Sequence, residues 1–303
     1  MTGDTRMTDD IRTAGDPRLA EEIRMTGDPV VTANILEVRG LRKTFVTRGA
    51  AGHGEHVAVD DVSFDVPRGS CLAIVGESGS GKTTTARIVA GLETADTGTV
   101  TIDGETAAGR GSRRGRAARP VQMVFQDPFG SLDPRQRVGA AIDELLRLHH
   151  RLGRAERRAR VLELLAQVGL DERCAGEFPG NLSGGQRQRV AIARALSMEP
   201  KLLILDEAVS ALDVSVQAQV LNLLIDIRRQ TGISYLFISH DLAVVRQISD
   251  RCAVMCDGRL VEEGTTAEVL GSPREEYTRT LIDAVPRPGW TPRRRTGPAE
   301  SGE

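Results

Sequence analysis

The sequence predicts an α/β fold with a mostly parallel central sheet. Apolar runs of strand length, Cys71–Val75, Lys201–Asp206, Ser234–Ile238 and Cys252–Met255, are separated by stretches with helical periodicity. Strands that alternate with helices indicate crossover connections, which bring the strands side by side in parallel. The first of these runs leads directly into a glycine-rich turn, and a helical pattern follows the turn.

The elements before that turn predict strands. Residues 1–33 are polar and poor in apolar side chains, so we expect a disordered leader. Ile35–Leu41 and His56–Val66 alternate apolar and polar residues, which is typical of half-buried strands. Thr47–Gly54, between them, is rich in glycine and predicts a loop.

Both helices and strands are expected after the glycine-rich turn. Helical periodicity runs through Lys82–Leu92, and short strands are expected at Gly98–Gly104 and Val121–Phe125. Residues 134–178 form a helix-dominated block, with helices expected at Gly139–Leu148 and Ala155–Val168. Beyond Pro286 the chain is rich in Pro, Arg, Gly and Glu, which indicates a frayed tail.

Composition excludes several classes of protein. The 303 residues carry 40 Lys+Arg and 42 Asp+Glu, and a net charge of -2 gives no basic field for nucleic acid. The basic run Arg110–Arg119 lacks interleaved aromatic residues and is interpreted as a solvated face. No apolar stretch approaches the ~18 residues of a membrane-spanning helix. The four cysteines form no CxxC pair, which favours reduced thiols.

A phosphate-binding loop is the strongest motif. Gly76-Glu-Ser-Gly-Ser-Gly81-Lys82-Thr83 matches G-x-x-x-x-G-K-[ST] between a strand and a helix. Its glycines let successive N–H groups point at phosphate oxygens, and the helix N-terminus adds partial positive charge. Lys82 would reach the β- and γ-phosphates, and the Thr83 hydroxyl would hold Mg²⁺. A flexible Gly/Ser loop is the alternative, and the flanking strand and helix disfavour it.

A second motif supplies carboxylates. Leu202-Leu-Ile-Leu-Asp206-Glu207 is an apolar strand that ends in two acids, the Walker B pattern. Asp206 is placed to bind magnesium, and Glu207 is placed to orient or deprotonate a water that attacks the γ-phosphate. Two acids that merely end a strand at the surface would be common in isolation, but they are improbable beside a phosphate loop.

The third motif is Leu182-Ser183-Gly184-Gly185-Gln186. A Ser hydroxyl and glycine amides at a helix N-terminus form an anion site. The same residues would also serve as an ordinary helix cap. Two phosphate sites far apart in one sequence make sense if they are shared between two chains.

With these three motifs, residues 35–286 resemble the ATP-binding subunit of ABC transporters. The resemblance implies a P-loop NTPase fold of the ABC-type ATPase class, with a mostly parallel core sheet, an antiparallel β subdomain and a helical subdomain at about 127–183. It places the ATPase domain at 34–286, between the leader 1–33 and a disordered tail 287–303. It also implies ATP and Mg²⁺ as ligands.

The resemblance also implies roles for further residues, from their positions in the sequence. Gln126 matches the Q-loop, Ser210–Asp213 match the D-loop, and His240 matches the switch histidine, although a histidine after a strand is often only hydrogen-bonded at an edge. Phe45 lies where the family places an adenine-stacking aromatic, although it could instead belong to the core. The implied catalytic residues are Glu207, His240 and Gln126. The implied metal ligands are Thr83, Gln126 and Asp206. The implied nucleotide-binding residues are Phe45, Gly76, Glu77, Ser78, Gly79, Ser80, Gly81, Lys82, Thr83, Thr84, Ser183, Gly184, Gly185 and Gln186.

Longer strings, including Phe125–Pro134, Val209–Gln219 and Ser272–Leu281, are similar to the dipeptide, oligopeptide and nickel importer group, F-type ATPase subunit. This implies a peripheral protein on the cytoplasmic face of the membrane. Its partners would be a second ATPase (D-type, or a copy of itself), two permeases and an extracytoplasmic solute-binding protein, with no nucleic acid. An importer ATPase for another solute and a soluble non-transport ABC ATPase are the alternatives. Ala208 departs from the family, which usually has Pro there.

Overall fold

The computed structural model describes residues 33–49, 52–107, 120–126, 130 and 132–284. Within it, Ala33 onward belongs to one compact unit. The expected leader up to residue 32, the basic run 110–119 and the expected tail 287–303 lie outside the described residues.

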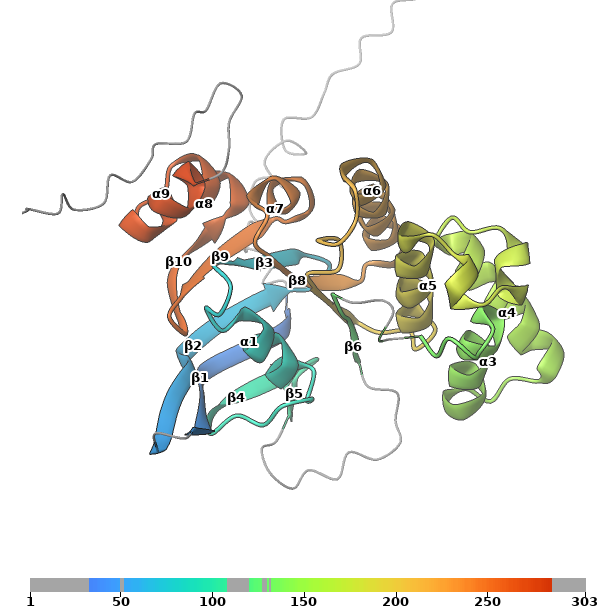
Figure 1. Cartoon of the computed structure of the whole chain (residues 1–303), viewed down its shortest axis with the longest axis horizontal. Coiled ribbons are helices and arrows are strands. Elements are labelled where there is room, and N and C mark those ends of the chain that lie inside the picture. Colours follow the sequence, from blue (N-terminus) through green and yellow to red (C-terminus); the bar gives the residue numbers. More distant parts are fainter. Residues whose placement is uncertain (1–32, 50–51, 108–119, 127–129, 131, 285–303) are drawn as a thin grey trace, which may run out of the picture. The chain divides into compact units, whose positions relative to one another are not determined.

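A six-stranded sheet, in the order β10-β9-β3-β8-β7-β6, occupies the centre of this unit (Figure 1). Its strands are β3 (Cys71–Val75), β6 (Val121–Val124), β7 (Leu202–Asp206), β8 (Ser234–Ser239), β9 (Arg251–Cys256) and β10 (Arg259–Thr265). All neighbours are parallel except β10, which runs antiparallel to β9. Every residue of β3, β7 and β8 is buried, because both faces of the sheet are covered. The predicted parallel sheet is confirmed.

A second, antiparallel sheet has the order β2-β1-β4-β5. Its strands are β1 (Asn34–Gly49), β2 (Gly52–Pro67), β4 (Thr97–Ile102) and β5 (Glu105–Ala107). The loop predicted at Thr47–Gly54 is wrong for the described residues, because β1 extends to Gly49, β2 begins at Gly52, and Thr47 pairs with Gly54. Glycine disfavours a strand only weakly, and a growing antiparallel ladder overrides that preference.

The strand expected at Gly98–Gly104 is shorter than predicted. It ends at Ile102, and the backbone reverses into β5 at Asp103 and Gly104, which have φ of 54° and 78°. Two central residues with positive φ form the hairpin turn for which Asp-Gly is a strong local signal. The Asp103-Gly104 pair is thus a turn signal in the sequence, and the strand was predicted to run through it only because the alternating apolar residues before it were extended too far.

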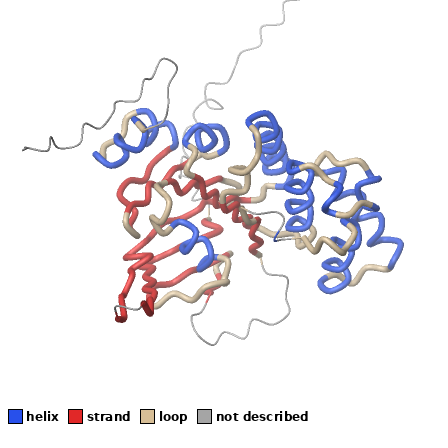
Figure 2. Tube along the Cα trace, viewed as in Figure 1, coloured by secondary structure: helices blue, strands red, loops and turns tan. Residues whose placement is uncertain are grey.

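The two faces of the six-stranded sheet pack against different layers. Leu72 and Ile74 of β3 face α1 (Lys82–Val89) and the antiparallel sheet. Ala73 and Val75 face the opposite side, where α5 (Gly184–Leu196), α6 (Val214–Thr231) and α7 (Leu242–Ile248) pack. Alternate side chains of a strand point to opposite faces, so each core receives every second residue. Figure 2 shows helices beyond both faces of the strands.

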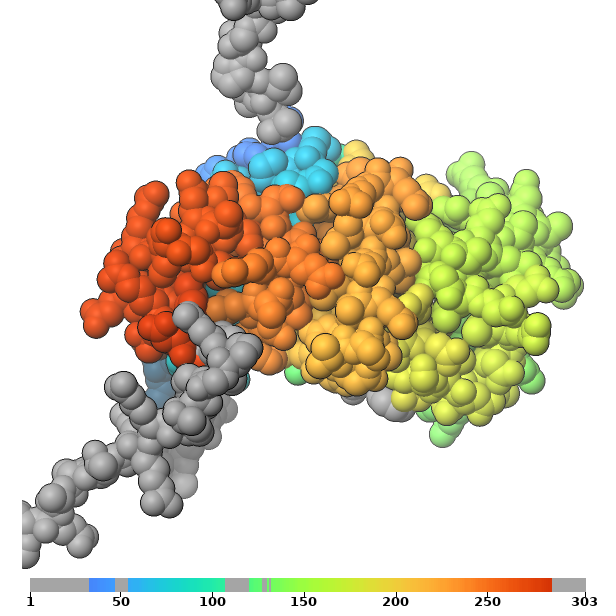
Figure 3. Space-filling view, turned by 90° about the horizontal axis from the view of Figure 1, so that it is seen from above, coloured from blue at the N-terminus to red at the C-terminus, as the bar shows by residue number. Residues whose placement is uncertain are grey.

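The helix-dominated block forms as predicted. It contains α3 (Val138–His149), α4 (Arg154–Gln167) and the short 3₁₀ helix η1 (Glu172–Gly176), and a 3₁₀ turn, η2 (Pro179–Asn181), follows it. The described chain ends with α8 (Thr266–Gly271) and α9 (Glu276–Asp283), which form the red surface next to the orange one in Figure 3. Among the described helices, none is both long and apolar enough to cross a membrane.

Candidate functional site: a nucleotide site at one edge of the sheet

Four predicted site segments meet at one edge of the six-stranded sheet. Parallel strands place their carboxyl ends at the same edge, and the register pairs Val75 with Ser239 and Val124 with Leu205. The phosphate loop, which follows β3, therefore begins next to the end of β8 and at the same edge as the ends of β7 and β6. His240 follows β8, Glu207 follows β7, and Gln126 lies just beyond β6.

The phosphate loop is pressed against two other strands. A Cβ atom at Gly76, where φ is 152°, would lie 2.1 Å from the Met255 carbonyl oxygen of β9. A Cβ atom at Gly81, where φ is 102°, would lie 2.2 Å from the Ala58 carbonyl oxygen of β2. Both positions combine a left-handed backbone with a backbone contact, so only glycine fits. Sequence reasoning could not name Met255 or Ala58, because neither belongs to the motif.

Lys82 fills the interior of the loop. Its ammonium donates to the Gly76 carbonyl at 2.9 Å, the Glu77 carbonyl at 2.6 Å and the Ser80 hydroxyl at 3.3 Å. Burial lowers the pKa of Lys82, and the nearby charges of Glu207, Asp206 and Glu77 oppose that shift. The loop thus holds a cation at the position where phosphate charge is expected to lie.

Thr83 and Asp206 join the loop to the end of β7. The Thr83 hydroxyl donates to Asp206 Oδ1 at 3.1 Å, and Asp206 is 5% exposed. Burial raises the pKa of Asp206, and the charge of Glu207 adds to it, while the hydrogen bond from Thr83 lowers it. A hydroxyl and a carboxylate side by side are the hard oxygen donors that Mg²⁺ prefers, so these residues fit that ion.

Glu207 and His240 form a pair at the same edge. Glu207 Oε1 lies 3.3 Å from His240 Nδ1, and the Glu207 side chain is 18% exposed. Glu207 has φ of 48°, and its backbone N–H donates to the Ile238 carbonyl at 3.0 Å. A left-handed backbone costs a non-glycine residue energy, which commonly marks a functional position. Gln126 is exposed, beyond the end of β6.

Ser183–Gln186 form the cap of α5. The Ser183 hydroxyl accepts from the Gln186 N–H at 3.2 Å, and the Gln186 side chain accepts from the Ser183 N–H at 2.9 Å. This is a capping box. Because α1 and α5 pack on opposite faces of the sheet, the two motifs begin helices in different layers of the chain.

Phe45 lies on β1, half-buried, opposite His56 of β2. The Lys43 ammonium lies 5.0 Å from the centroid of its ring, within range of a cation–π contact. Two residues beyond His56, Ala58 touches the phosphate loop at Gly81. The strand pair that carries Phe45 therefore borders the loop.

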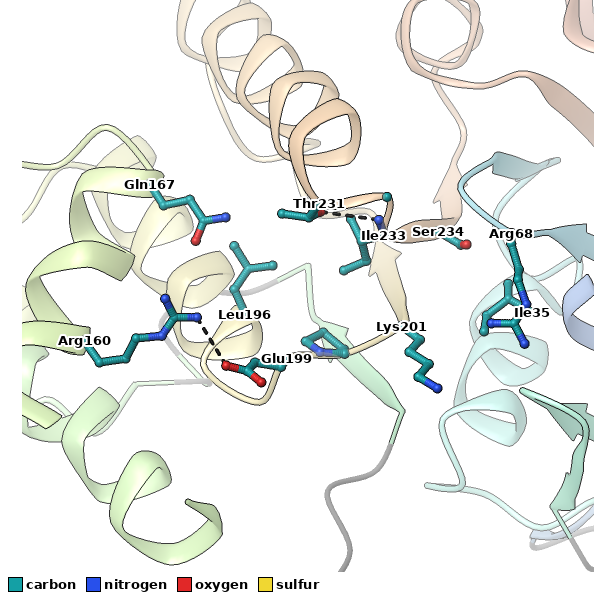
Figure 4. A pocket seen from close by; sticks show the side chains of 12 residues that line it. Ile35, Arg68, Arg160, Gln167, Leu196, Glu199, Lys201, Thr231, Ile233 and Ser234 are labelled. Atoms are coloured by element: carbon teal, nitrogen blue, oxygen red, sulfur yellow. Dashed lines mark hydrogen bonds and ion pairs between the residues drawn. The ribbon is translucent and has the colours of Figure 1, made fainter. Parts of the chain in front are cut away.

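A cavity of about 390 Å³ lies away from this edge, where β7 and β8 begin (Figure 4). Its cationic side chains already have acidic partners. Arg68 and Lys201 both contact Asp103, and Arg160 contacts Glu199. These ion pairs already engage the cationic side chains, and none of the predicted site residues lines the cavity, so the phosphate loop remains the nucleotide site.

Comparison with known proteins agrees with this geometry. The family model for the ABC transporter matches residues 59–210. The oligopeptide transport ATP-binding protein OppF of Bacillus subtilis (strain 168) is 46% identical over 85% of this chain and 84% of its own length. The glutathione import ATP-binding protein GsiA of Pectobacterium atrosepticum is 50% identical over 76% of this chain, but the chain covers 37% of that protein.

Among solved structures, the dimeric post-hydrolysis state of the ATP-binding cassette MJ0796, bound to ADP and phosphate, is similar. The TM-score is 0.67, with 29% identity over 76% of this chain and 98% of that one. The resemblance drawn from the three motifs is confirmed. The chain belongs to the ABC transporter family and is one of its ATPases.

Proposed function

We propose that this chain is the ATPase subunit that powers peptide import by an ABC transporter. The observation that carries the proposal is the edge of the sheet where the phosphate loop, Asp206, Glu207 and His240 meet. The relatives named for oligopeptide and glutathione import support a peptide as the solute. Coverage of 84% of OppF supports the F-type assignment within that group.

ATP is the substrate. Amides of the loop from Ser78 to Thr84, together with Lys82, bind its phosphates, and Phe45 stacks on its base. Thr83, Asp206 and Gln126 hold Mg²⁺, which neutralises phosphate charge. Lys82 exchanges its three contacts within the loop for phosphate oxygens, so its buried charge keeps partners throughout.

Glu207 orients and deprotonates the attacking water, and His240 contacts the γ-phosphate and Glu207 together. The 3.3 Å contact between them supports this division, since each side chain limits the rotation of the other. Their backbone positions are fixed by the ends of β7 and β8. Only the side chains need to adjust when substrate arrives.

The placement of Ser183–Gln186 supports a dimer. Their helix packs on the face opposite α1, so they serve the nucleotide of a partner ATPase, either a D-type subunit or a second copy. Two permeases bind the pair at the cytoplasmic face of the membrane, and an extracytoplasmic solute-binding protein delivers the peptide. The ATPase domain spans 34–286, with 127–183 as its helical subdomain.

Glu207→Gln tests the catalytic part. The amide keeps the shape but cannot accept a proton, so we expect retained ATP binding and turnover lower by about 100-fold or more. Glu163→Gln, on the exposed surface of α4, is the matched control and leaves both unchanged. Hydrolysis by Glu207→Gln at the wild-type rate would exclude Glu207 as the base.

Purification of the tagged protein from detergent-solubilised membranes, with partners identified by mass spectrometry, tests the transport part. Two permeases and a second ATPase are expected. Recovery of a soluble homodimer, or of ribosomal or nucleic-acid partners, would overturn import and leave the ATPase assignment intact.

A further inference from the structure

The last described helix reaches the phosphate loop. The Glu77 backbone N–H donates to the Tyr277 hydroxyl of α9 at 3.4 Å, although the two residues are 200 positions apart. Helix α9 lies beyond residues 59–210, which the family model matches. Tyr277 is half-buried, and its ring packs against the core that contains α5 to α7.

We infer that Tyr277 is a positioning residue for the phosphate loop: its hydroxyl holds the Gly76–Glu77 peptide from outside while Lys82 holds it from inside. This rests on the proposed nucleotide site. The Gly76 carbonyl and the Glu77 N–H belong to one planar peptide unit. Lys82 donates to that carbonyl at 2.9 Å, and Tyr277 accepts from that N–H at 3.4 Å.

The two anchors differ in what happens to them when ATP binds. Lys82 turns toward phosphate, so the Gly76 carbonyl loses its inner partner. Tyr277 keeps its contact, because it lies on the other side of the peptide. The hydroxyl therefore preserves the shape of the loop in the state that binds phosphate, and this lowers the cost of ordering it.

Helix α9 is itself fixed in place. The Glu262 carboxylate of β10 accepts the backbone N–H groups of Arg274 and Glu275, at 2.8 and 3.2 Å, just before the helix begins. Thr278 is fully buried beside Tyr277. At the end of β9, burial and the charge of Asp257 raise the pKa of the Cys256 thiol, and a hydrogen bond with the Tyr277 hydroxyl partly offsets this. The hydroxyl thus lies between β9 and the loop.

The experiment compares the two tyrosines of the chain. Tyr277→Phe removes the hydroxyl that contacts the loop. Tyr235→Phe is the matched control, because its hydroxyl donates to the Leu224 carbonyl at 2.8 Å within the core and touches no part of the site. The full-length protein is titrated with Mg²⁺ and a non-hydrolysable ATP analogue, and steady-state hydrolysis of ATP is measured alongside.

We expect Tyr277→Phe to raise the Kd of the analogue and the KM for ATP by about 2- to 10-fold, which is the worth of one ordinary hydrogen bond. Its kcat remains that of the wild type, whereas its thermal midpoint falls slightly, because the nucleotide-free protein contains the same hydrogen bond. Tyr235→Phe lowers the thermal midpoint and leaves Kd unchanged. An unchanged Kd for Tyr277→Phe, or an equal rise in both variants, overturns the inference.

A second variant tests the same contact without changing Tyr277 itself. Glu262→Ala frees the start of α9, and we expect a similar rise in Kd. Combined with Tyr277→Phe it adds nothing further, because both changes release the same peptide. Additive effects would overturn the inference. A wild-type protein that binds no ATP analogue would instead overturn the proposed function, and the inference with it.

Discussion

Two adjacent glycines of the α5 cap face different surroundings, and this gives a sharp prediction. A Cβ atom at Gly185 would lie 2.3 Å from Val216 Cγ1 in the first turn of α6. At Gly184 the nearest atom, Leu212 Cδ2, would be 3.6 Å away, an ordinary contact. Gly185→Ala therefore requires the Val216 side chain or its helix to shift, whereas Gly184→Ala has room.

The cost of such overpacking is about 1 to 3 kcal/mol. For a domain of this size that corresponds to a thermal midpoint lower by about 2 to 12 °C. Gly184→Ala, by contrast, removes a glycine from a helix, so we expect its midpoint to be unchanged or slightly higher. Neither glycine has a positive φ, so backbone strain does not enter the comparison.

Thermal unfolding of the nucleotide-free protein, followed by circular dichroism, measures these differences. Val216→Ala added to Gly185→Ala restores the missing space, and the double variant is expected to recover part of the loss. A Gly185→Ala protein as stable as the wild type would refute the reasoning. So would a double variant no more stable than Gly185→Ala alone.

Two further predictions concern the nucleotide site. Lys82→Ala removes the cation inside the loop, and we expect ATP affinity to fall by about 10- to 100-fold, as for a charge-assisted hydrogen bond; unchanged affinity in the titration would contradict the assignment. Burial raises the pKa of Asp206, so the stability contributed by its protonated form is present below the unfolded-state pKa and is lost as pH rises through the folded-state pKa. Asp206→Asn is therefore expected to raise the thermal midpoint of the nucleotide-free protein at pH 7, with a difference that shrinks on acidification. A variant no more stable than the wild type at pH 7 would show that burial of the charge is not costly.

The fold was predictable where burial leaves a pattern. Buried parallel strands appear in the sequence as unbroken apolar runs, and β3, β7 and β8 were found in this way. The inner parts of β1 and β2 were also predicted, at Ile35–Leu41 and His56–Val66, but the outer part of their hairpin was not, because it is rich in glycine and its pairing depends on the opposite strand. Local preference predicts a loop there, and tertiary pairing overrides it.

The sequence by itself determined the chemistry. The loop, the two acids after β7 and the cap of α5 are local patterns, since phosphate binding needs glycines, a lysine and a hydroxyl at fixed spacing. Only the tertiary structure decided what surrounds them. Met255 and Ala58 oblige Gly76 and Gly81 to be glycine, and Tyr277 meets Glu77 from the far end of the chain. These contacts join residues that are distant in sequence, and no local spacing encodes them.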